Sequence, residues 1–565
     1  MAREASGREK AQERGGRDVA KFEASNTSTY EKAVLILVGA VASRLLQLRP
    51  RKLTSKAFGL LKNLPIVSNA VASKKTSVLR KVEDSVARSS LQAPLISHLP
   101  SEPTSQDRTL ALLTQRSHRD VSATFGRSKL SGTVYLDPSS EHAQFLSCVY
   151  ARMAHTNPLH SDCFPSVARL EREAVSMVSQ SLLNAPDSAA GCVTSGGTES
   201  IFGAVLTARD SRSNTSRPNV VACNTAHAAL TKACRFLGVE LRTLPAPTKS
   251  NADSSTNREK PATASMIGAT GTQLRRRMDR NTILVYASAP SYPHGTMDDI
   301  PSIASAAQSI GAHCHVDACL GGFILPFWRE EALEDSASGV PPFDFSVRGV
   351  TSISIDTHKY GLSHKGSSIL IFRNTELRKA HFSTVSSWPG GLYASPGFAG
   401  SRSGGLIAQT WASLVHTGLS VYRENALQIH SLKQRLVEGL EAIDELYVIG
   451  QPSMVVAFGS NTSWLDIFEV GDEMTRHGWL INALQRPDGL HFCITTVHSE
   501  STVDCLLSDL RSAIESLLSQ RDIYSSSQNK SEGRAPIYGM ASSLPDRTLV
   551  GEMLADTQDI MLQYS

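Results

Sequence analysis

The stretch that decides the fold is VTSISIDTHKYGLSHKGSSILIF, residues 350–372. Two runs rich in β-branched and apolar residues, 350–355 and 367–372, predict strands on either side of a polar turn. Burial between two strands disfavours the charged form of a lysine and lowers its pKa, and the neutral amine condenses with carbonyl groups. Lys359 is therefore a candidate for covalent attachment of an aldehyde cofactor, and the alternative is a surface lysine in a hairpin. The polar turn carries four titratable side chains: Asp356, His358, Lys359 and Lys365.

A second stretch, VTSGGTESI at residues 193–201, predicts a strand, a glycine turn and the start of a helix. Glycines let the backbone approach an anion closely, and the free amides of a helix N-terminus favour a phosphate group. Gly197 and Thr198 are the candidate phosphate-binding residues of this turn. Taken alone, the stretch is equally consistent with a capped helix that binds nothing.

A third stretch, HCHVDACLGGF at residues 313–323, places Asp317 at the carboxyl end of a short strand. A carboxylate in this position can keep a pyridinium nitrogen protonated, which makes the ring an electron sink. By itself Asp317 is also consistent with a helix cap or a loop carboxylate. The order of phosphate turn, acid and lysine is more specific than any one motif, and it predicts pyridoxal 5'-phosphate (PLP) as the cofactor.

The same motifs, with several longer strings, resemble a known family. The strings include SGTVY (131–135), NPLHSDCFPSVARLE (157–171), AHAALTKACRFLGVE (226–240), HVDACLGGFILPF (315–327) and GGLYASPGFAGSRSGG (390–405). Over roughly residues 50–520 the chain resembles the sphingosine-1-phosphate lyases, a branch of the PLP-dependent group II decarboxylase-like enzymes. The resemblance implies an α/β fold of type I: a mainly parallel sheet with flanking helices, followed by a small C-terminal α+β domain.

The resemblance also implies roles for residues around the cofactor. It makes Lys359 the covalent attachment point, places His227 over the cofactor ring, and adds His358 to the cofactor-binding residues. Ser401 is expected near the cofactor phosphate, in a loop that reaches the partner's active site in a homodimer. We expect the active sites of this homodimer to lie at the subunit interface.

Three residues become candidates for binding a substrate phosphate through the resemblance: Tyr135, Asn157 and His160. From the sequence alone, Asn157 is more simply a turn cap and His160 a surface histidine. Lys365 is a candidate for phosphate contact or proton transfer. Tyr135, Lys365 and Lys359 are the three candidates for moving protons, and the sequence does not choose among them.

The expected reaction is the PLP-dependent retro-aldol cleavage of a phosphorylated long-chain base to phosphoethanolamine and a long-chain aldehyde, a step of sphingolipid metabolism. A PLP-dependent amino-acid decarboxylase is the first alternative, and it would require a cation for the substrate carboxylate. A non-catalytic dimeric scaffold of the same fold is the second. The presence of Lys359, Asp317 and the glycine turn argues against the scaffold.

Composition is that of a globular chain, with 565 residues, 41% hydrophobic residues, 19% charged residues and a net charge of +4. We found no basic stripe interleaved with aromatic residues, so we expect no nucleic-acid partner. The nine cysteines are scattered without a C-x-x-C pair. This pattern indicates a reducing compartment and argues against disulfides and a zinc site, so we expect no metal.

The hydrophobic segment AVLILVGAVAS, residues 33–43, contains eleven residues without charge before Arg44. At ~1.5 Å per residue it spans about half of a ~30 Å hydrocarbon core. We expect a weak membrane anchor first, an interfacial helix second and a soluble packing helix third. The resemblance implies an endoplasmic reticulum membrane with the catalytic domain in the cytosol, and the basic residues after the segment suit a cytosolic side.

We expect two local features that the structure can test directly. A helix over 141–154 carries the apolar stripe Phe145, Leu146, Val149 and Met153, which we expect to be core. A short strand is expected at 464–468 in the C-terminal domain. The expected domains are a disordered tail (1–30), a short hydrophobic anchor or interfacial helix (31–52), a helical segment (53–129), a large PLP-binding domain (130–420) with a surface insertion (245–281), a small C-terminal domain (421–520) and a polar tail (521–565).

Overall fold

The computed structural model describes residues 73, 75–77, 79–80, 83–84, 96–117, 127–246, 268–332, 340–524 and 547–564. These residues belong to two compact units. The smaller unit contains helical residues between 73 and 84 and helix α17 (Arg547–Tyr564), joined by an ion pair of 2.6 Å between Lys75 and Asp556. The larger unit holds the described residues from 105 to 524. The expected tail at 1–30 and hydrophobic segment at 31–52 lie outside the described residues.

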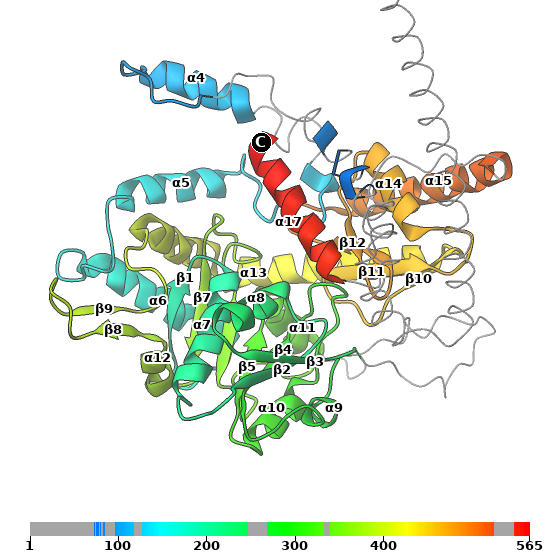
Figure 1. Cartoon of the computed structure of the whole chain (residues 1–565). Coiled ribbons are helices and arrows are strands. Elements are labelled where there is room, and N and C mark those ends of the chain that lie inside the picture. Colours follow the sequence, from blue (N-terminus) through cyan, green and yellow to red (C-terminus); the bar gives the residue numbers. More distant parts are fainter. Residues whose placement is uncertain are drawn as a thin grey trace, which may run out of the picture. The chain divides into compact units, whose positions relative to one another are not determined.

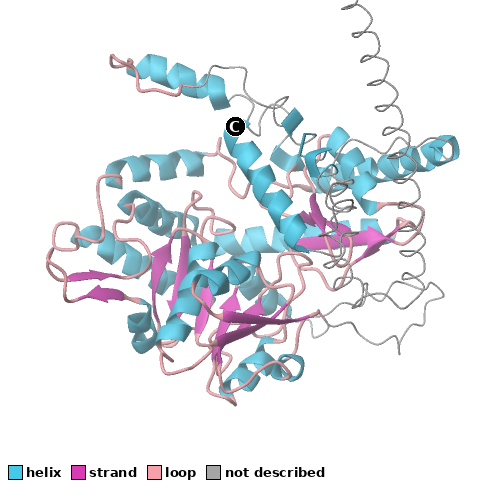
Figure 2. Cartoon of the chain, in the orientation of Figure 1, coloured by secondary structure: helices cyan, strands magenta, loops and turns pink. Residues whose placement is uncertain are grey.

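The large domain is built on a seven-stranded sheet with the order β1-β7-β6-β5-β4-β2-β3 (Figures 1 and 2). Strand β7 runs antiparallel to both of its neighbours, whereas the other neighbouring pairs are parallel. The mainly parallel sheet predicted from the sequence is therefore confirmed. Its strands are β1 (Ala190–Thr194), β2 (Asn219–Cys223), β3 (Glu240–Leu244), β4 (Thr282–Ser288), β5 (His313–Asp317), β6 (Ser352–Ile355) and β7 (Ser368–Phe372).

Helices flank this sheet, as parallel strands require because both of their faces must be buried. Helices α7 and α8 share one apolar core with β2 and β4, in which Val205, Leu230 and Leu284 are fully buried. Helix α10 packs against β4 and β5. The helical elements before the domain boundary are α4 (Gln106–Ser117), η1 (Arg127–Lys129), α5 (Glu141–Met153), α6 (Pro165–Leu182), α7 (Gly197–Asp210), α8 (Ala228–Phe236), α9 (Gly271–Arg275), α10 (Ile300–Gln308), η3 (Gly321–Phe323), α11 (Leu325–Ala332) and α12 (Thr375–His381).

The long helix α13 (Gly404–Glu441) leads from the large domain into the small one. Gly418 breaks its helical path with φ 66° and ψ 168°, close to the domain boundary predicted at residue 420. The small domain has an antiparallel sheet with the order β10-β11-β13-β12, and a separate two-stranded ribbon joins β8 to β9. The remaining elements are β8 (Ser383–Val385), β9 (Tyr393–Ser395), β10 (Leu446–Val448), β11 (Val455–Ser460), α14 (Ile467–Arg476), β12 (Asn482–Leu484), β13 (Gly489–Cys493) and α15 (Glu500–Tyr524).

The first residues of the expected large domain are attached to the small-domain sheet. Leu130 forms a parallel bridge with Leu480, and the Gly132 amide donates to the Cys493 carbonyl at 3.1 Å. The Ser131 hydroxyl donates to the carbonyl of His491. Residues 130–132, which were predicted to begin the large domain, are therefore hydrogen-bonded to the small domain.

Two expectations about surface and loop segments were wrong. Part of the expected insertion, residues 268–281, packs in the large domain, because Leu274 on α9 is fully buried and the helix has a capping box formed by Thr270 and Gln273. The strand expected at 464–468 does not form, because Asp466 caps α14 by accepting a hydrogen bond from the Phe468 amide. In both cases a side-chain cap stabilises a helix start that the prediction did not take into account.

The apolar stripe expected as core on α5 is only partly buried. Leu146 is fully buried, whereas Phe145 is 39% exposed and Val149 is half-buried. Helix α5 packs against α13 along one narrow face, so its other apolar residues are left at the surface.

This difference predicts unequal costs for two neighbouring substitutions. Leu146→Ala should lower the free energy of unfolding by about 2–5 kcal/mol, because it leaves a cavity in a packed core. Phe145→Ala should cost less, about 1 kcal/mol, because Phe145 is 39% exposed and lies outside the packed core. Denaturant unfolding at a protein concentration that keeps subunits apart measures both, and equal costs would contradict the assignment of only Leu146 to the core.

Candidate active site

A pocket of about 350 Å³ opens where several strands of the large sheet end. The carboxyl ends of β1, β4, β5 and β6 meet at this edge, and ligands of parallel α/β sheets bind outside such ends. The pocket is lined by residues at the ends of these strands or directly after them, including Ser195, Asp317 and Asp356. The glycine turn, the acid and the lysine turn, which are far apart in sequence, therefore lie around one pocket.

The N-terminus of α7 forms one wall of the pocket. Gly196 has φ 149°, and Gly197 begins the helix. A Cβ atom on Gly197 would lie 2.8 Å from the Cys319 sulfur and 2.9 Å from Asp356 Oδ1, so no side chain fits there. The helix start at Gly197 and Thr198 is confirmed, and backbone amides at such a start are available to an anion.

Asp317 ends β5 and points into the pocket between two donors. The Tyr286 hydroxyl donates to its Oδ2, and the Cys319 amide donates to its Oδ1 at 3.0 Å. Tyr286 is itself fully buried, and burial together with the neighbouring Asp317 charge raises the pKa of its hydroxyl. The tyrosine therefore stays protonated and holds the carboxylate in one orientation.

His227 stands at the start of α8 and lines the same pocket. Its Nδ1 accepts a hydrogen bond from the Ala229 amide at 3.2 Å, so it also caps its own helix. The ring of Tyr292 meets the His227 ring edge-on at 5.9 Å and the His491 ring at 5.0 Å. This aromatic row fixes the orientation of the His227 ring at the pocket.

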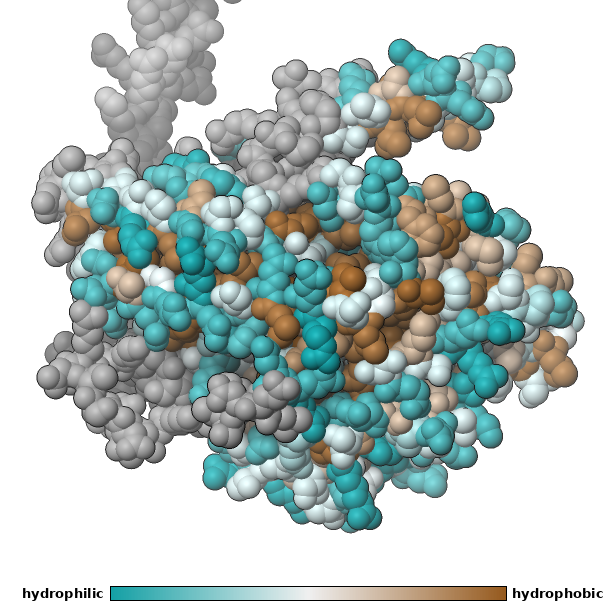
Figure 3. Space-filling view, turned by 180° about the vertical axis from the view of Figure 1, so that it is seen from behind, coloured by the Kyte–Doolittle hydropathy of each residue, from teal (hydrophilic) through white to brown (hydrophobic). Residues whose placement is uncertain are grey.

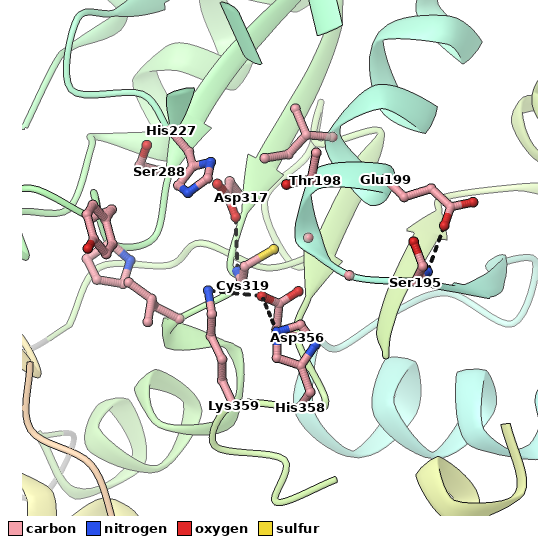
Figure 4. A pocket seen from close by; sticks show the side chains of 16 residues that line it. Ser195, Thr198, Glu199, His227, Ser288, Asp317, Cys319, Asp356, His358 and Lys359 are labelled. Carbon is pink, nitrogen blue, oxygen red and sulfur yellow. Dashed lines mark hydrogen bonds and ion pairs between the residues drawn. The ribbon is translucent and has the colours of Figure 1, made fainter. Parts of the chain in front are cut away.

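Lys359 lies in the turn between β6 and β7, with its amine 2.9 Å from Asp356 Oδ2 (Figure 4). In the same view, the Lys359 side chain extends upward toward Asp317 and His227. His358 Nε2 lies 3.6 Å from the same Asp356 oxygen, and its Nδ1 is 2.5 Å from the Ser367 carbonyl. The turn therefore carries a buried charge pair that faces the phosphate wall.

The expected pKa of Lys359 was wrong in direction. Burial alone would lower it, but the Asp356 charge and hydrogen bond raise the pKa of Lys359 above its usual range. In return, although burial alone would raise it, the Lys359 charge holds the pKa of Asp356 below its usual value. The sequence prediction treats Lys359 as an isolated charge, whereas the structure pairs it with the Asp356 carboxylate three residues earlier.

Five predicted site residues do not line this pocket: Tyr135, Asn157, His160, Lys365 and Ser401. Tyr135 is buried, with its hydroxyl 3.8 Å from the Cys493 sulfur and its ring 4.8 Å from the Lys365 amine. Asn157 donates to the Ser401 hydroxyl at 3.0 Å and accepts from the Arg402 amide. His160 is exposed beside Asn157. The five residues form two groups: Tyr135 and Lys365 beside Tyr360, and Asn157 and His160 on a loop that meets Ser401 through Asn157.

Some pocket residues were not assigned roles from the sequence, above all Asp356, Cys319 and Tyr292. Asp356 offered a readable signal, because a carboxylate directly after a buried strand and three residues before a buried lysine can pair with it. Tyr286 gave no such signal, since its hydroxyl reaches Asp317 only through the pairing of β4 with β5.

Comparisons with known proteins agree with this geometry. Residues 133–388 match the pyridoxal-dependent decarboxylase conserved domain. A glutamate decarboxylase structure from Lactobacillus brevis, 18% identical, shares the fold with a TM-score of 0.62 over 75% of this chain and 96% of that one. The fold and pocket define a PLP-dependent enzyme of fold type I.

More similar relatives specify the branch. The chain is 39% identical over 558 residues to the sphingosine-1-phosphate lyase of Arabidopsis thaliana, covering 95% of this chain and 96% of the relative. The solved sphingosine-1-phosphate lyase of Burkholderia pseudomallei is 33% identical, with a TM-score of 0.66 over 78% of this chain and 99% of that one. The chain belongs to the sphingosine-1-phosphate lyase family, which confirms the resemblance read from its motifs.

The close approach at Gly197 predicts a specific loss of cofactor binding. Gly197→Ala should weaken PLP binding about tenfold or more, because the new methyl group meets Cys319 and Asp356. Absorbance titration with PLP measures the affinity. Gly551→Ala, at a helical position with no atom within 4 Å of the new carbon, is the control. Unchanged affinity in Gly197→Ala would contradict the assignment of this wall to the cofactor phosphate.

Proposed function

We propose that the protein is a PLP-dependent aldehyde-lyase that cleaves sphingosine-1-phosphate and related phosphorylated long-chain bases. The products are a long-chain aldehyde and phosphoethanolamine. One observation carries the proposal: Lys359, Asp317 and the N-terminus of α7 converge on one pocket in a chain 39% identical to a sphingosine-1-phosphate lyase.

The pocket residues fit each part of PLP. When bound, the cofactor supplies an aldehyde that joins an amine and a ring that accepts electrons. The Gly197 and Thr198 backbone would hold its phosphate, Asp317 would hold its ring nitrogen protonated, and His227 would stack on its ring. His358 adjoins this set, and Lys359 provides the amine that joins the aldehyde.

The reaction requires two proton movements on the substrate. The C3 hydroxyl loses a proton as the C2–C3 bond breaks, and C2 gains a proton before phosphoethanolamine leaves. Of the three candidates, Lys359 lines the pocket, whereas Tyr135 and Lys365 contact each other and do not line it. Lys359, once released by the substrate amine, is therefore our choice for the proton transfer at C2.

A homodimer accounts for the residues that stand outside the pocket. Asn157, His160 and Ser401 form a surface group in one subunit, and we infer that they bind the substrate phosphate or complete the cofactor site across an interface. Large apolar side chains are exposed nearby on α5 and α13, including Tyr150 (40% exposed) and Val415 (52% exposed). Figure 3 shows apolar side chains at several places on one face of the molecule. A second subunit would cover such side chains.

We also propose that the protein works at the endoplasmic reticulum membrane with its catalytic domain in the cytosol. The apolar segment at 33–43 and the basic residues after it support this proposal. In the part of the chain that the structure describes, no helix is both long and apolar enough to cross a bilayer.

The activity is tested by a single-turnover assay with cofactor-loaded protein. Sphingosine-1-phosphate should give aldehyde and phosphoethanolamine, whereas unphosphorylated sphingosine and amino acids should give neither. Lys359→Ala should abolish both products, because it removes the amine that joins the cofactor aldehyde. Release of carbon dioxide from an amino acid without aldehyde would assign the protein to the decarboxylases instead.

The shared active site is tested by mixing inactive subunits. Lys359→Ala and His160→Ala subunits should each be impaired alone, and their heterodimer should regain activity because one of its sites is intact. As a matched control, both changes are placed in one subunit and mixed with wild type. That heterodimer should have no intact site, so activity in it would show that each subunit acts alone.

A further inference from the structure

Asp356 lies at the centre of the pocket without a role in the assignments above. It directly follows β6, and its side chain is only 3% exposed. One of its oxygens, Oδ2, contacts both the Lys359 amine and His358 Nε2. The other oxygen, Oδ1, is buried and has no hydrogen-bond partner among the described residues.

The unpartnered oxygen lies against Gly197 at the start of α7. A Cβ atom on Gly197 would lie 2.9 Å from Oδ1, so the carboxylate adjoins the phosphate-binding wall. A buried carboxylate must be balanced by a cation or a proton, and a nearby phosphate increases this need. Lys359 supplies the balancing charge in the structure, since His358 is held largely neutral by burial, which lowers its pKa.

Other titratable groups face the Lys359 amine from several elements. His358 and Lys365 belong to its own turn, and both disfavour a second positive charge. Asp317 and Cys319 face it from β5 and the residues after β5, and Cys493 faces it from β13. Among the described residues, Asp356 is the carboxylate in direct contact with the amine.

We propose that Asp356 is a catalytic counter-ion that keeps the Lys359 nitrogen protonated, both as the free ammonium and after that nitrogen has joined the cofactor aldehyde. Condensation of an ammonium with an aldehyde releases one water and leaves one proton on nitrogen. The positive charge opposite Asp356 is therefore conserved. The retained proton draws electrons from the linked carbon, which favours attack by the substrate amine. This inference rests on the PLP assignment in the proposed function, and it does not depend on the identity of the substrate.

The test is a pH titration of the absorption of the bound cofactor. Asp356→Asn keeps the shape of the side chain and removes its charge. The midpoint for loss of the protonated linkage should fall by about 1–3 pH units, since an opposite charge in contact has been removed. Asp356→Glu should recover part of this shift. Asp344→Asn removes a buried carboxylate from an ion pair with Arg329 outside the pocket, and it should leave the midpoint unchanged.

An unchanged midpoint in cofactor-loaded Asp356→Asn, or an equal shift in Asp344→Asn, would overturn the proposal. If Asp356→Asn does not retain the cofactor, the Lys359 amine is titrated in cofactor-free protein by NMR of lysine labelled with carbon-13 at the ε methylene. Its titration should then move to lower pH than in wild type, and an unmoved titration overturns the proposal. Failure of the wild-type protein to bind PLP would instead refute the proposed function.

Discussion

The position of β7 between β1 and β6 is the constraint on which the active site depends. Strand β1 leads into the phosphate-binding turn and β6 leads into the turn of Asp356 and Lys359. The Ser368 hydroxyl on β7 donates to the Ile355 carbonyl at 3.1 Å and lies 3.0 Å from the Ser200 hydroxyl on α7. These contacts fix the separation of the two loops, because any slip of β7 would change the side chains that face them.

The two lysines of the turn have pKa values shifted in opposite directions. Lys359 contacts a carboxylate, so its ammonium is retained despite the loss of water around it. Lys365 faces the Tyr135 ring, and burial followed by repulsion from Lys359 lowers the pKa of Lys365. The lowering of a lysine pKa by burial, which the sequence predicts for Lys359, therefore occurs at Lys365. A single nearby carboxylate decides which lysine carries the charge.

The sequence predicted those parts of the site that follow from local order along the chain. Asp317, Gly197 and Lys359 each follow a readable strand, and parallel pairing brings strand ends together without further information. Contacts across the sheet or between domains were not predictable in this way. Tyr286 reaches Asp317 from a neighbouring strand, and Tyr135 reaches the turn of Lys359 from a segment paired with the small domain. Only three-dimensional packing reveals such partners.

The attachment of residue 130 to residue 480 has a consequence for how the chain folds. Ribosomal synthesis proceeds from the N-terminus, and domains that are continuous in sequence can fold as they emerge. Here Leu130 can pair with Leu480 only after about 350 further residues have been synthesised. Tyr135, whose ring contacts Tyr360 edge-on at 5.0 Å, belongs to the same segment as Leu130. Assembly of the site residues beside Tyr360 therefore depends on synthesis of the small-domain sheet.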